Sequence, residues 1–446
     1  MTGTYRPATA ILALGDEFYD PATPADFPQT ILRYHDEDAA GALGLKLDDD
    51  DWVRHFGRFE ALPDNLSEPL ALRYHGHQFR QYNPEIGDGR GFLFAQLRDG
   101  GGRLLDLGTK GSGTTPYSRR GDGRLTLLGG VREVLATRYL EHLGVNTSKS
   151  FCLIETGEEL TRGDEPSPTR SAVLTRLSHS HIRFGAFQRQ AYFQNRDNLA
   201  ALSDYCRTHF YPDTESVEGM FAQVVARSAD SVASWMAAGF VHGVMNTDNM
   251  NITGETFDYG PYRFLPHFDP NFTAAYFDHQ GLYAFGRQPE AMAWNLAQLA
   301  QSLSLIAEDQ ALIDAMDSFA PLYQAALNTH FLRRLQVESR GFDEDVTLVR
   351  AIFKFLLESQ TPWPDAWHDW QGGAGRADTP QLHDYRGAAY DDWLELLKHH
   401  TPTGEKPDTE RPASLLYDEI GALWEPIAAD DDWSAFENKL KSFDRA

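Results

Sequence analysis

Residues 242–249, His-Gly-Val-Met-Asn-Thr-Asp-Asn, and residues 258–260, Asp-Tyr-Gly, decide the fold of this chain of 446 residues. Asn249 ends the first segment and Asp258 begins the second. Their side chains offer an amide oxygen and a carboxylate, and Mg²⁺ prefers oxygen ligands of this kind around a bound triphosphate. The two segments therefore predict two oxygen ligands for a metal ion.

The same two segments resemble the catalytic loop and the metal-binding turn of a protein kinase, with one residue changed. In the kinase pattern a His-Arg-Asp or His-Gly-Asp triplet precedes an Asn, and an Asp-Phe-Gly turn follows. Val244 stands in place of the catalytic Asp, and its side chain cannot accept a proton. Asp248 directly precedes Asn249 and is the carboxylate that we expect to replace the missing base.

The residues before this loop predict a β-rich unit. The expected elements, in chain order, are a glycine-rich loop over 87–91, strands over 92–97 and 103–110, a helix over 131–143, and strands over 149–160 and 170–177. This order matches the small lobe of a kinase. Lys110 ends the second strand and Glu133 lies on the helix, so an ion pair between them would direct the ammonium group towards a nucleotide.

The residues after Ser180 predict a mainly helical unit. Helices are expected over 217–240, from Pro289 onwards and over 309–335, followed by Trp-bearing helical segments after Phe342. We expect the aromatic residues of the segment 259–285 to belong to the core. The fold class is therefore α+β, a protein-kinase-like two-lobed fold with a mixed β-rich small lobe and a mainly helical large lobe. The expected division is an N-terminal extension (1–69), a kinase-like N-lobe (70–184), a kinase-like C-lobe (185–340) and a helical C-terminal extension (341–446).

Composition excludes several classes of function. Hydrophobic residues make up 41% of the chain and aromatic residues 12%, as in a globular protein. A net charge of −25 argues against nucleic acids and anionic membranes as general partners. Two cysteines form no disulfide framework, and neither a secretory signal nor a long apolar run is visible, so a cytoplasmic location is expected.

Basic residues nevertheless gather near the predicted nucleotide site. Gly87 and Gly89 allow backbone N–H groups to approach phosphate oxygens, and Arg90 adds charge. The segment 117–124 contains three arginines, and Arg176 and Arg183 are placed to make bidentate bonds to phosphate. The paired histidines lack a third ligand at suitable spacing, so we interpret them as structural: His75 and His77, and His179 and His181.

Four segments together resemble the selenoprotein O family of kinase-like protein adenylyltransferases. They are Thr-Lys-Gly-Ser-Gly-Thr-Thr-Pro-Tyr-Ser-Arg-Arg-Gly-Asp-Gly-Arg (109–124), Val-Arg-Glu (131–133), Ser-His-Ile-Arg-Phe-Gly (180–185) and residues 242–250. The resemblance extends from Arg73 to Leu305. It implies that ATP binds in the reverse orientation to that in a kinase, so that AMP is transferred to Ser, Thr or Tyr hydroxyls of proteins.

The resemblance also assigns roles to individual residues. It implies that Asp248 accepts the proton, that Glu133 orients Lys110, and that Asn249 and Asp258 bind Mg²⁺. The implied nucleotide contacts are Gly87, Gly89, Arg90, Lys110, Asp122, Gly123, Arg176 and Arg183. The chain ends Lys-Ser-Phe-Asp-Arg-Ala (441–446), without the Cys or selenocysteine of the family's redox tail, so regulation by a tail disulfide is not expected.

Three other functions remain open at this point. They are UMP transfer with Mn²⁺, a conventional phosphotransferase that uses Asp248 as its base, and a nucleotide-binding pseudokinase without catalysis. The sequence does not identify the protein substrates, the acceptor hydroxyl or the oligomeric state.

Overall fold

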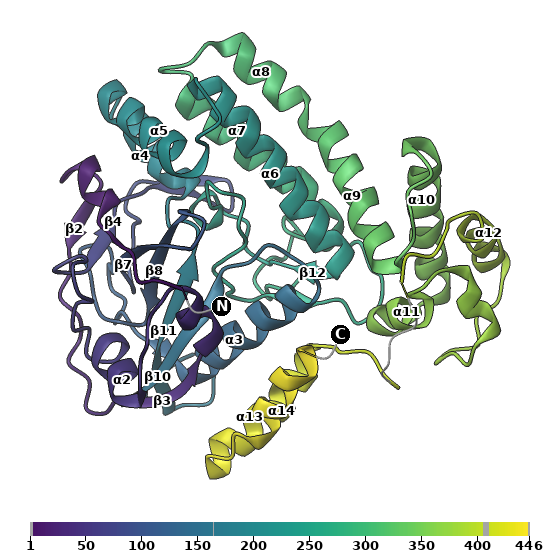
Figure 1. The fold of residues 1–446 in the computed structure, drawn as a ribbon, viewed down its shortest axis with the longest axis horizontal. Coiled ribbons are helices and arrows are strands. Elements are labelled where there is room, and N and C mark those ends of the chain that lie inside the picture. The colour runs from purple at the N-terminus through teal and green to yellow at the C-terminus, as the bar shows by residue number, and fades with distance from the viewer. Residues whose placement is uncertain (1–2, 164, 405–409, 445–446) are drawn as a thin grey trace.

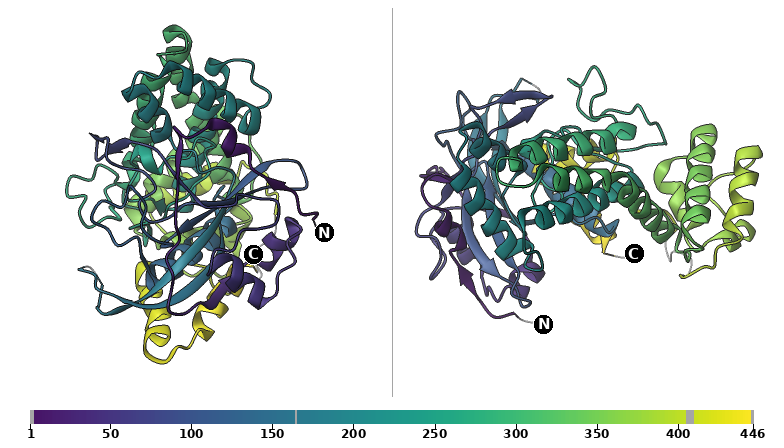
Figure 2. Two further views of the ribbon diagram at one scale, coloured as in Figure 1. Left: turned by 90° about the vertical axis from the view of Figure 1, so that its left-hand side faces the viewer. Right: turned by 90° about the horizontal axis from the view of Figure 1, so that it is seen from above.

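One large antiparallel sheet and an extensive set of helices make up the protein, which is a mixed α+β fold (Figure 1). The computed structural model describes residues 3–163, 165–404 and 410–444. The sheet occupies one end of the molecule, and the helices α10 (Phe342–Ser359), α11 (Trp363–Trp370) and α12 (Ala388–Leu397) occupy the other (Figures 1 and 2). Within the described residues, no helix is long and apolar enough to cross a membrane.

The sheet has nine strands in the described part of the chain. Its path runs β2-β4-β7-β8-β11-β10-β3, with β1 paired to β7 and β9 paired to β11, and the pairings are antiparallel. The strands are β1 (Pro7–Ala8), β2 (Tyr19–Pro21), β3 (Ile31–His35), β4 (Leu70–Leu72), β7 (Leu93–Arg98), β8 (Leu104–Lys110), β9 (Leu125–Thr126), β10 (Lys149–Leu160) and β11 (Thr169–Ser178).

The sequence predicts β7, β8, β10 and β11, and the structure confirms these four strands. It does not predict β1, β2 and β3, because these strands are short, two of them contain proline, and none shows a long alternation of apolar and polar residues. Strands β2 and β3 form the two ends of the path through the sheet. Residues near the N-terminus therefore complete the sheet on both sides.

Strand β8 and helix α3 (Leu127–His142) place the first charged pair of the site. Strand β8 is buried at every position, and its last residue, Lys110, pairs with Leu174 of β11. Helix α3 begins after Thr126, whose side chain accepts a hydrogen bond from the N–H of Gly129 at 3.0 Å. Because α3 packs against β10 and β11, Glu133 is buried between the helix and the sheet.

Helix α6 (Val217–Ala238) packs against most of the other helices that follow the sheet. The others are α4 (Phe184–Tyr192), α5 (Arg196–Phe210), α7 (Gln288–Leu303), α8 (Asp309–Asp317) and α9 (Phe319–Leu335). The structure corrects the single helix expected over 309–335 to two helices that meet at Ser318. Pro321 explains the break, because its ring clashes with the carbonyl four residues earlier and it has no N–H to donate.

Two small strand pairs carry the loops of the site. Helix α6 ends at Gly239, which has a φ of 68°, and leads into β12 (Phe240–Val241), which pairs with β13 (Arg263–Phe264). The segment 242–258 runs between these two strands and includes a short 3₁₀ helix, η2 (Thr247–Asn249). A second hairpin, β5 (Gly76–Gln78) and β6 (Gln81–Asn83), lies against η2.

The remaining helices cover the sheet and extend the helical end. Helices α1 (Glu37–Ala42) and α2 (Asp49–Phe56) belong to an apolar cluster with β7 and β10. A separate cluster contains α10 (Phe342–Ser359), α11 (Trp363–Trp370) and α12 (Ala388–Leu397). The last helices, α13 (Tyr417–Asp430) and α14 (Ser434–Phe443), return to the sheet end and lie below α3 in Figure 1. The imidazole Nδ1 of His142 lies 2.8 Å from the backbone oxygen of Phe443, which fixes this return.

Candidate active site

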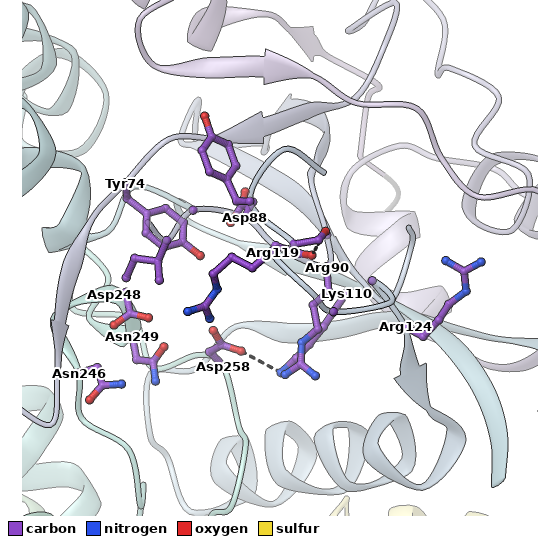
Figure 3. Close-up of a pocket in the computed structure, with 18 of the residues that line it drawn as sticks. Tyr74, Asp88, Arg90, Lys110, Arg119, Arg124, Asn246, Asp248, Asn249 and Asp258 are labelled. Carbon is purple, nitrogen blue, oxygen red and sulfur yellow. Dashed lines mark hydrogen bonds and ion pairs between the residues drawn. The ribbon is translucent and has the colours of Figure 1, made fainter. Parts of the chain in front are cut away.

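A cavity of about 700 Å³ lies between the glycine loop, the ends of β8 and β11, and the segment from Val244 to Asp258 (Figure 3). The predicted site residues that line this cavity are Gly87, Gly89, Arg90, Lys110, Asp122, Gly123, Arg176, Arg183, Asp248, Asn249 and Asp258. The remaining predicted residue, Glu133, lies behind Lys110 and accepts a hydrogen bond from its ammonium group. The fold therefore gathers all the predicted residues at one place.

Asp258 is the electrostatic centre of the pocket, because three cations converge on its carboxylate. The Nζ atom of Lys110 lies 2.8 Å from Oδ1, and Nη1 of Arg176 lies 3.5 Å from the same oxygen. The Nη1 atom of Arg183 lies 3.1 Å from Oδ2. Burial acts to raise the pKa of Asp258, but Lys110, Arg176 and Arg183 hold it well below its usual range. Asp258 therefore stays ionised and can bind a cation.

Lys110 and Glu133 form a buried ion pair between β8 and α3. Their side chains are 5% and 1% exposed, so each charge depends on the other for compensation. The Nη1 atom of Arg176 lies 3.9 Å from Oε2 of Glu133, and this oxygen accepts no hydrogen bond from the described residues. Glu133 therefore holds both Lys110 and Arg176 at the base of the pocket.

Asp248 has the environment of a general base. Its Oδ2 accepts a hydrogen bond from Nε2 of Gln78 at 3.4 Å, while its buried Oδ1 has no hydrogen-bond partner among the described residues. Burial raises the pKa of Asp248 to about 6. A carboxylate with this pKa is ionised near neutral pH and is basic enough to take a proton from a substrate hydroxyl.

The loop that carries Asp248 is fixed by the β5–β6 hairpin. The hydroxyl of Thr247 accepts a hydrogen bond from the N–H of His77 at 2.7 Å and donates to Oε1 of Gln188 at 2.6 Å. The amide oxygen of Asn246 accepts from the N–H of Phe79 at 3.0 Å. These bonds set the position of Asp248 before any ligand binds.

Asn249 is oriented by a hydrogen bond within its own loop. Its Nδ2 donates to the backbone oxygen of Val244 at 2.9 Å, which leaves the amide oxygen for another partner. Asn249 and Asp258 lie next to each other in Figure 3. The described residues contain no group of three or more His, Cys, Asp or Glu that could hold a metal, so Asn249 and Asp258 would share a Mg²⁺ ion with water or phosphate oxygens.

The ring nitrogens of the first histidine pair, His75 and His77, have hydrogen-bond partners other than a metal. The Nδ1 atom of His75 lies 2.9 Å from the hydroxyl of Tyr82, and Nδ1 of His77 lies 2.8 Å from Nε2 of Gln188. Burial lowers the pKa of His75 to about 4 and also lowers that of His77. These contacts agree with a structural role for the first pair.

The glycine loop packs directly on the arginine-rich segment. A Cβ atom at Gly87 would lie 2.4 Å from the ring of Tyr117, and a Cβ at Gly89 would lie 2.9 Å from its backbone oxygen. The hydroxyl of Ser118 donates to the backbone oxygen of Gly89 at 2.5 Å. Glycine is therefore required by close packing, and the two segments form one wall of the pocket.

The arginines of this wall differ in their pairing. Arg124 pairs with Glu158 at 2.6 Å, and Arg162 pairs with Asp122 at 2.8 Å. Three exposed arginines line the pocket and form no ion pair with the carboxylates of the described ranges: Arg90, Arg119 and Arg120. Their charge is available to a polyphosphate.

Several lining residues are not among those that the sequence assigns to the site, and three of them, Asp88, Gln78 and Arg162, contact assigned residues. Asp88 lies between Gly87 and Gly89 of the loop; burial raises its pKa, and Nη2 of Arg183 lies 3.5 Å from its Oδ1. Gln78 and Arg162 also line the pocket. Neither has a local sequence signal, since both reach the site only through tertiary contacts with Asp248 and Asp122.

The structure partly corrects the expectation that the aromatic residues of the segment 259–285 belong to the core. Tyr259, Tyr262 and Phe285 are buried, as expected of core residues. Tyr276 and Phe277 are 73% and 42% exposed. Aromatic residues are expected in the core because they are apolar. Tyr276 and Phe277 are exposed because the path of the backbone in this loop turns their side chains outward.

Comparison with known proteins identifies the family. A family model described as protein adenylyltransferase SelO matches residues 2–444. A protein of Synechocystis sp. named protein nucleotidyltransferase YdiU is 43% identical, and the alignment covers 98% of this chain and 97% of that protein. A protein of the same name from Gloeobacter violaceus is also 43% identical, with 97% and 93% covered. This chain therefore belongs to the SelO family of protein adenylyltransferases and is a nucleotidyltransferase.

Proposed function

We propose that the pocket transfers AMP from ATP to Ser, Thr or Tyr hydroxyls of proteins, on a kinase-like two-lobed fold. The proposed lobes are residues 70–184 and 185–340, with extensions over 1–69 and 341–446. One observation carries the proposal: two carboxylates in one pocket have opposite surroundings, with three cations on Asp258 and a buried oxygen of Asp248 that has no hydrogen-bond partner among the described residues. Asp258 is held ionised for binding a cation, whereas Asp248 is tuned for proton transfer.

The nucleotide would lie along the cationic wall of the pocket. The buried cations Lys110, Arg176 and Arg183 would contact its phosphates at the base of the pocket. The exposed arginines of the glycine loop and of the segment 117–124 would contact the phosphates from the solvent side. Asn249 and Asp258 would hold Mg²⁺, which when bound neutralises phosphate charge during the reaction. Their amide and carboxylate oxygens suit this ion.

The chemical step follows from the position of Asp248. The oxygen of the acceptor hydroxyl forms a bond to the α-phosphorus of ATP, and the bond from that phosphorus to the bridging oxygen of pyrophosphate breaks. Asp248 takes the hydroxyl proton, and pyrophosphate leaves with the bonding electron pair. Lys110 and the arginines stabilise the negative charge that develops on the phosphates. Val244 offers no base at the position that a kinase uses, and the reversed ATP orientation that the family resemblance implies would need none there.

The test compares ATP labelled at the α- and γ-phosphates, with the intact mass of the products as a second measurement. Transfer of the α-label, with a mass gain equal to AMP, supports the proposal. Transfer of the γ-label identifies a conventional phosphotransferase, and nucleotide binding without transfer of either label identifies a pseudokinase. Parallel reactions with UTP and Mn²⁺ determine whether UMP is the preferred group. Asp258→Ala should abolish transfer, and Phe342→Ala, an exposed residue at the start of α10, serves as the control.

A further inference from the structure

We propose that Tyr276 and Phe277, here called the aromatic pair, form a docking surface for an apolar segment of the protein substrate beside its acceptor hydroxyl. The inference rests on the proposed function, because it names the partner of the same pocket. The two rings lie 5.1 Å apart, and Tyr276 is 73% exposed. Large aromatic side chains exposed together commonly mark a surface that another molecule covers.

The aromatic pair is held outward by a fixed turn. Its neighbours in the chain, Ala275 and Asp278, are only 1% and 6% exposed. The carboxylate of Asp278 accepts hydrogen bonds from the N–H groups of Leu282 at 2.9 Å and Tyr283 at 2.8 Å. The N–H of Asp278 donates to the backbone oxygen of Ala275 at 3.1 Å. Because the backbone is already fixed, the pair loses little conformational freedom when it binds a partner.

The aromatic pair is connected to the pocket through the β5–β6 hairpin. The ring of Phe79 lies 5.7 Å from that of Phe277, and the N–H of Phe79 donates to the amide oxygen of Asn246, which lines the pocket. The residue before Phe79, Gln78, donates to the carboxylate of Asp248. A polypeptide whose hydroxyl reaches Asp248 would therefore place neighbouring residues over the aromatic pair.

The chemistry of this surface favours an apolar partner. Arg287, the nearest arginine in the chain, and Arg80, which follows Phe79, are both paired with Glu290, at 3.3 Å and 2.9 Å. The carboxylate of Asp278 is occupied by backbone N–H groups. The surface therefore presents the faces of two aromatic rings. Such rings contribute strongly to binding when an apolar side chain of the partner excludes water from them.

A binding experiment without ATP tests the inference directly. Two short synthetic peptides share a central Ser-Thr-Tyr, and the flanking residues are Leu and Phe in one and Ser in the other. Fluorescence anisotropy should show that the wild-type protein binds the apolar peptide about tenfold more tightly. The double variant Tyr276→Ala/Phe277→Ala should lose this preference. Equal affinity of the wild type for both peptides, or an undiminished preference in the double variant, would overturn the inference.

Two single variants serve as controls. Tyr276→Phe removes the hydroxyl but keeps the ring, so it should bind the apolar peptide as the wild type does. Phe342→Ala removes an aromatic residue that is 53% exposed at the start of α10, and should leave binding unchanged. Weaker binding by either control would show that the effect is not specific to the aromatic surface.

Transfer of α-label to the same peptides separates this inference from the proposed function. In the double variant, the KM for the apolar peptide should rise about tenfold while the KM for ATP stays the same. Transfer with an unchanged peptide KM would overturn the docking surface alone. Selective peptide binding that the double variant loses, without transfer of α-label by the wild type, would support the docking surface and contradict the proposed function.

Discussion

Arg183 pairs with Asp258 at 3.1 Å, and the same guanidinium nitrogen donates to the backbone oxygen of Asp248 at 2.7 Å. Arg183 is 5% exposed, so these contacts are little weakened by water. One side chain thus fixes the spacing between the proposed metal ligand and the proposed base. Because Asp258 also pairs with Lys110, a bound phosphate would compete with Asp258 for the same cations.

Replacing Asp258 should weaken the fold as well as the activity. Asp258→Asn removes the carboxylate that compensates Lys110, Arg176 and Arg183, so the free energy of unfolding should fall by about 3–5 kcal/mol. Urea unfolding monitored by tryptophan fluorescence measures this loss. Pyrophosphate should restore part of the stability, because its charge replaces that of the lost carboxylate. An unchanged midpoint of unfolding would show that the three cations do not depend on Asp258.

The rate of transfer should depend on the ionisation of Asp248. Its pKa is about 6, and the base acts only when ionised, so the rate should level off above that pH and fall about tenfold per pH unit below it. Asp248→Asn should lower kcat by about 10²–10⁴-fold and remove this limb of the profile. The measurement is kcat against pH at saturating ATP and peptide. A variant that keeps the same acidic limb would assign the proton transfer to another group.

Asp248 should also lower the stability of the protein at neutral pH. Its pKa rises from 3.8 to about 6 on folding, so its favourable contribution is complete below 3.8 and is lost as the pH rises through 6. Asp248→Asn cannot ionise and escapes this loss. When the pH is raised from about 5 to about 8, the unfolding free energy of the wild type should therefore fall by about 1 kcal/mol relative to that of the variant. Urea unfolding at both pH values measures the shift, and a constant difference would contradict it.

The parts of the site that the sequence predicts are those with a local signal. Lys110 could be paired with Glu133 because a hairpin turn precedes β8, helical spacing defines α3, and the two elements follow each other in the order of a kinase small lobe. Asn249 and Asp258 stand at fixed positions in short loops. For each of these residues, the pattern that predicts its role lies within a short stretch of the sequence.

The parts that the sequence does not predict depend on distant contacts. Arg162 lines the pocket through its pair with Asp122, and Gln78 through its bond to Asp248, and no neighbouring residue indicates either contact. Strands β2 and β3 are too short to recognise and form only by pairing with β4 and β10. The exposure of Tyr276 depends on the turn held by Asp278, which composition does not reveal.

The packing of Gly87 against Tyr117 should control the affinity for ATP. Gly87→Ala places a Cβ atom 2.4 Å from the ring of Tyr117, whose hydroxyl bonds to Asp20, so the ring and the glycine loop must move apart. This displacement should weaken ATP binding about tenfold in a calorimetric titration. Gly100→Ala is a matched control, because its Cβ would meet nothing within 4 Å.

A double variant shows whether the clash is the cause. Tyr117→Ala removes the ring, so adding Gly87→Ala to it should change the affinity for ATP much less than Gly87→Ala changes that of the wild type. The non-additivity measures the contact itself, because both single variants leave Lys110 and Asp258 in place. If the two effects simply add, the loss in Gly87→Ala arises from the backbone of the loop and not from contact with Tyr117.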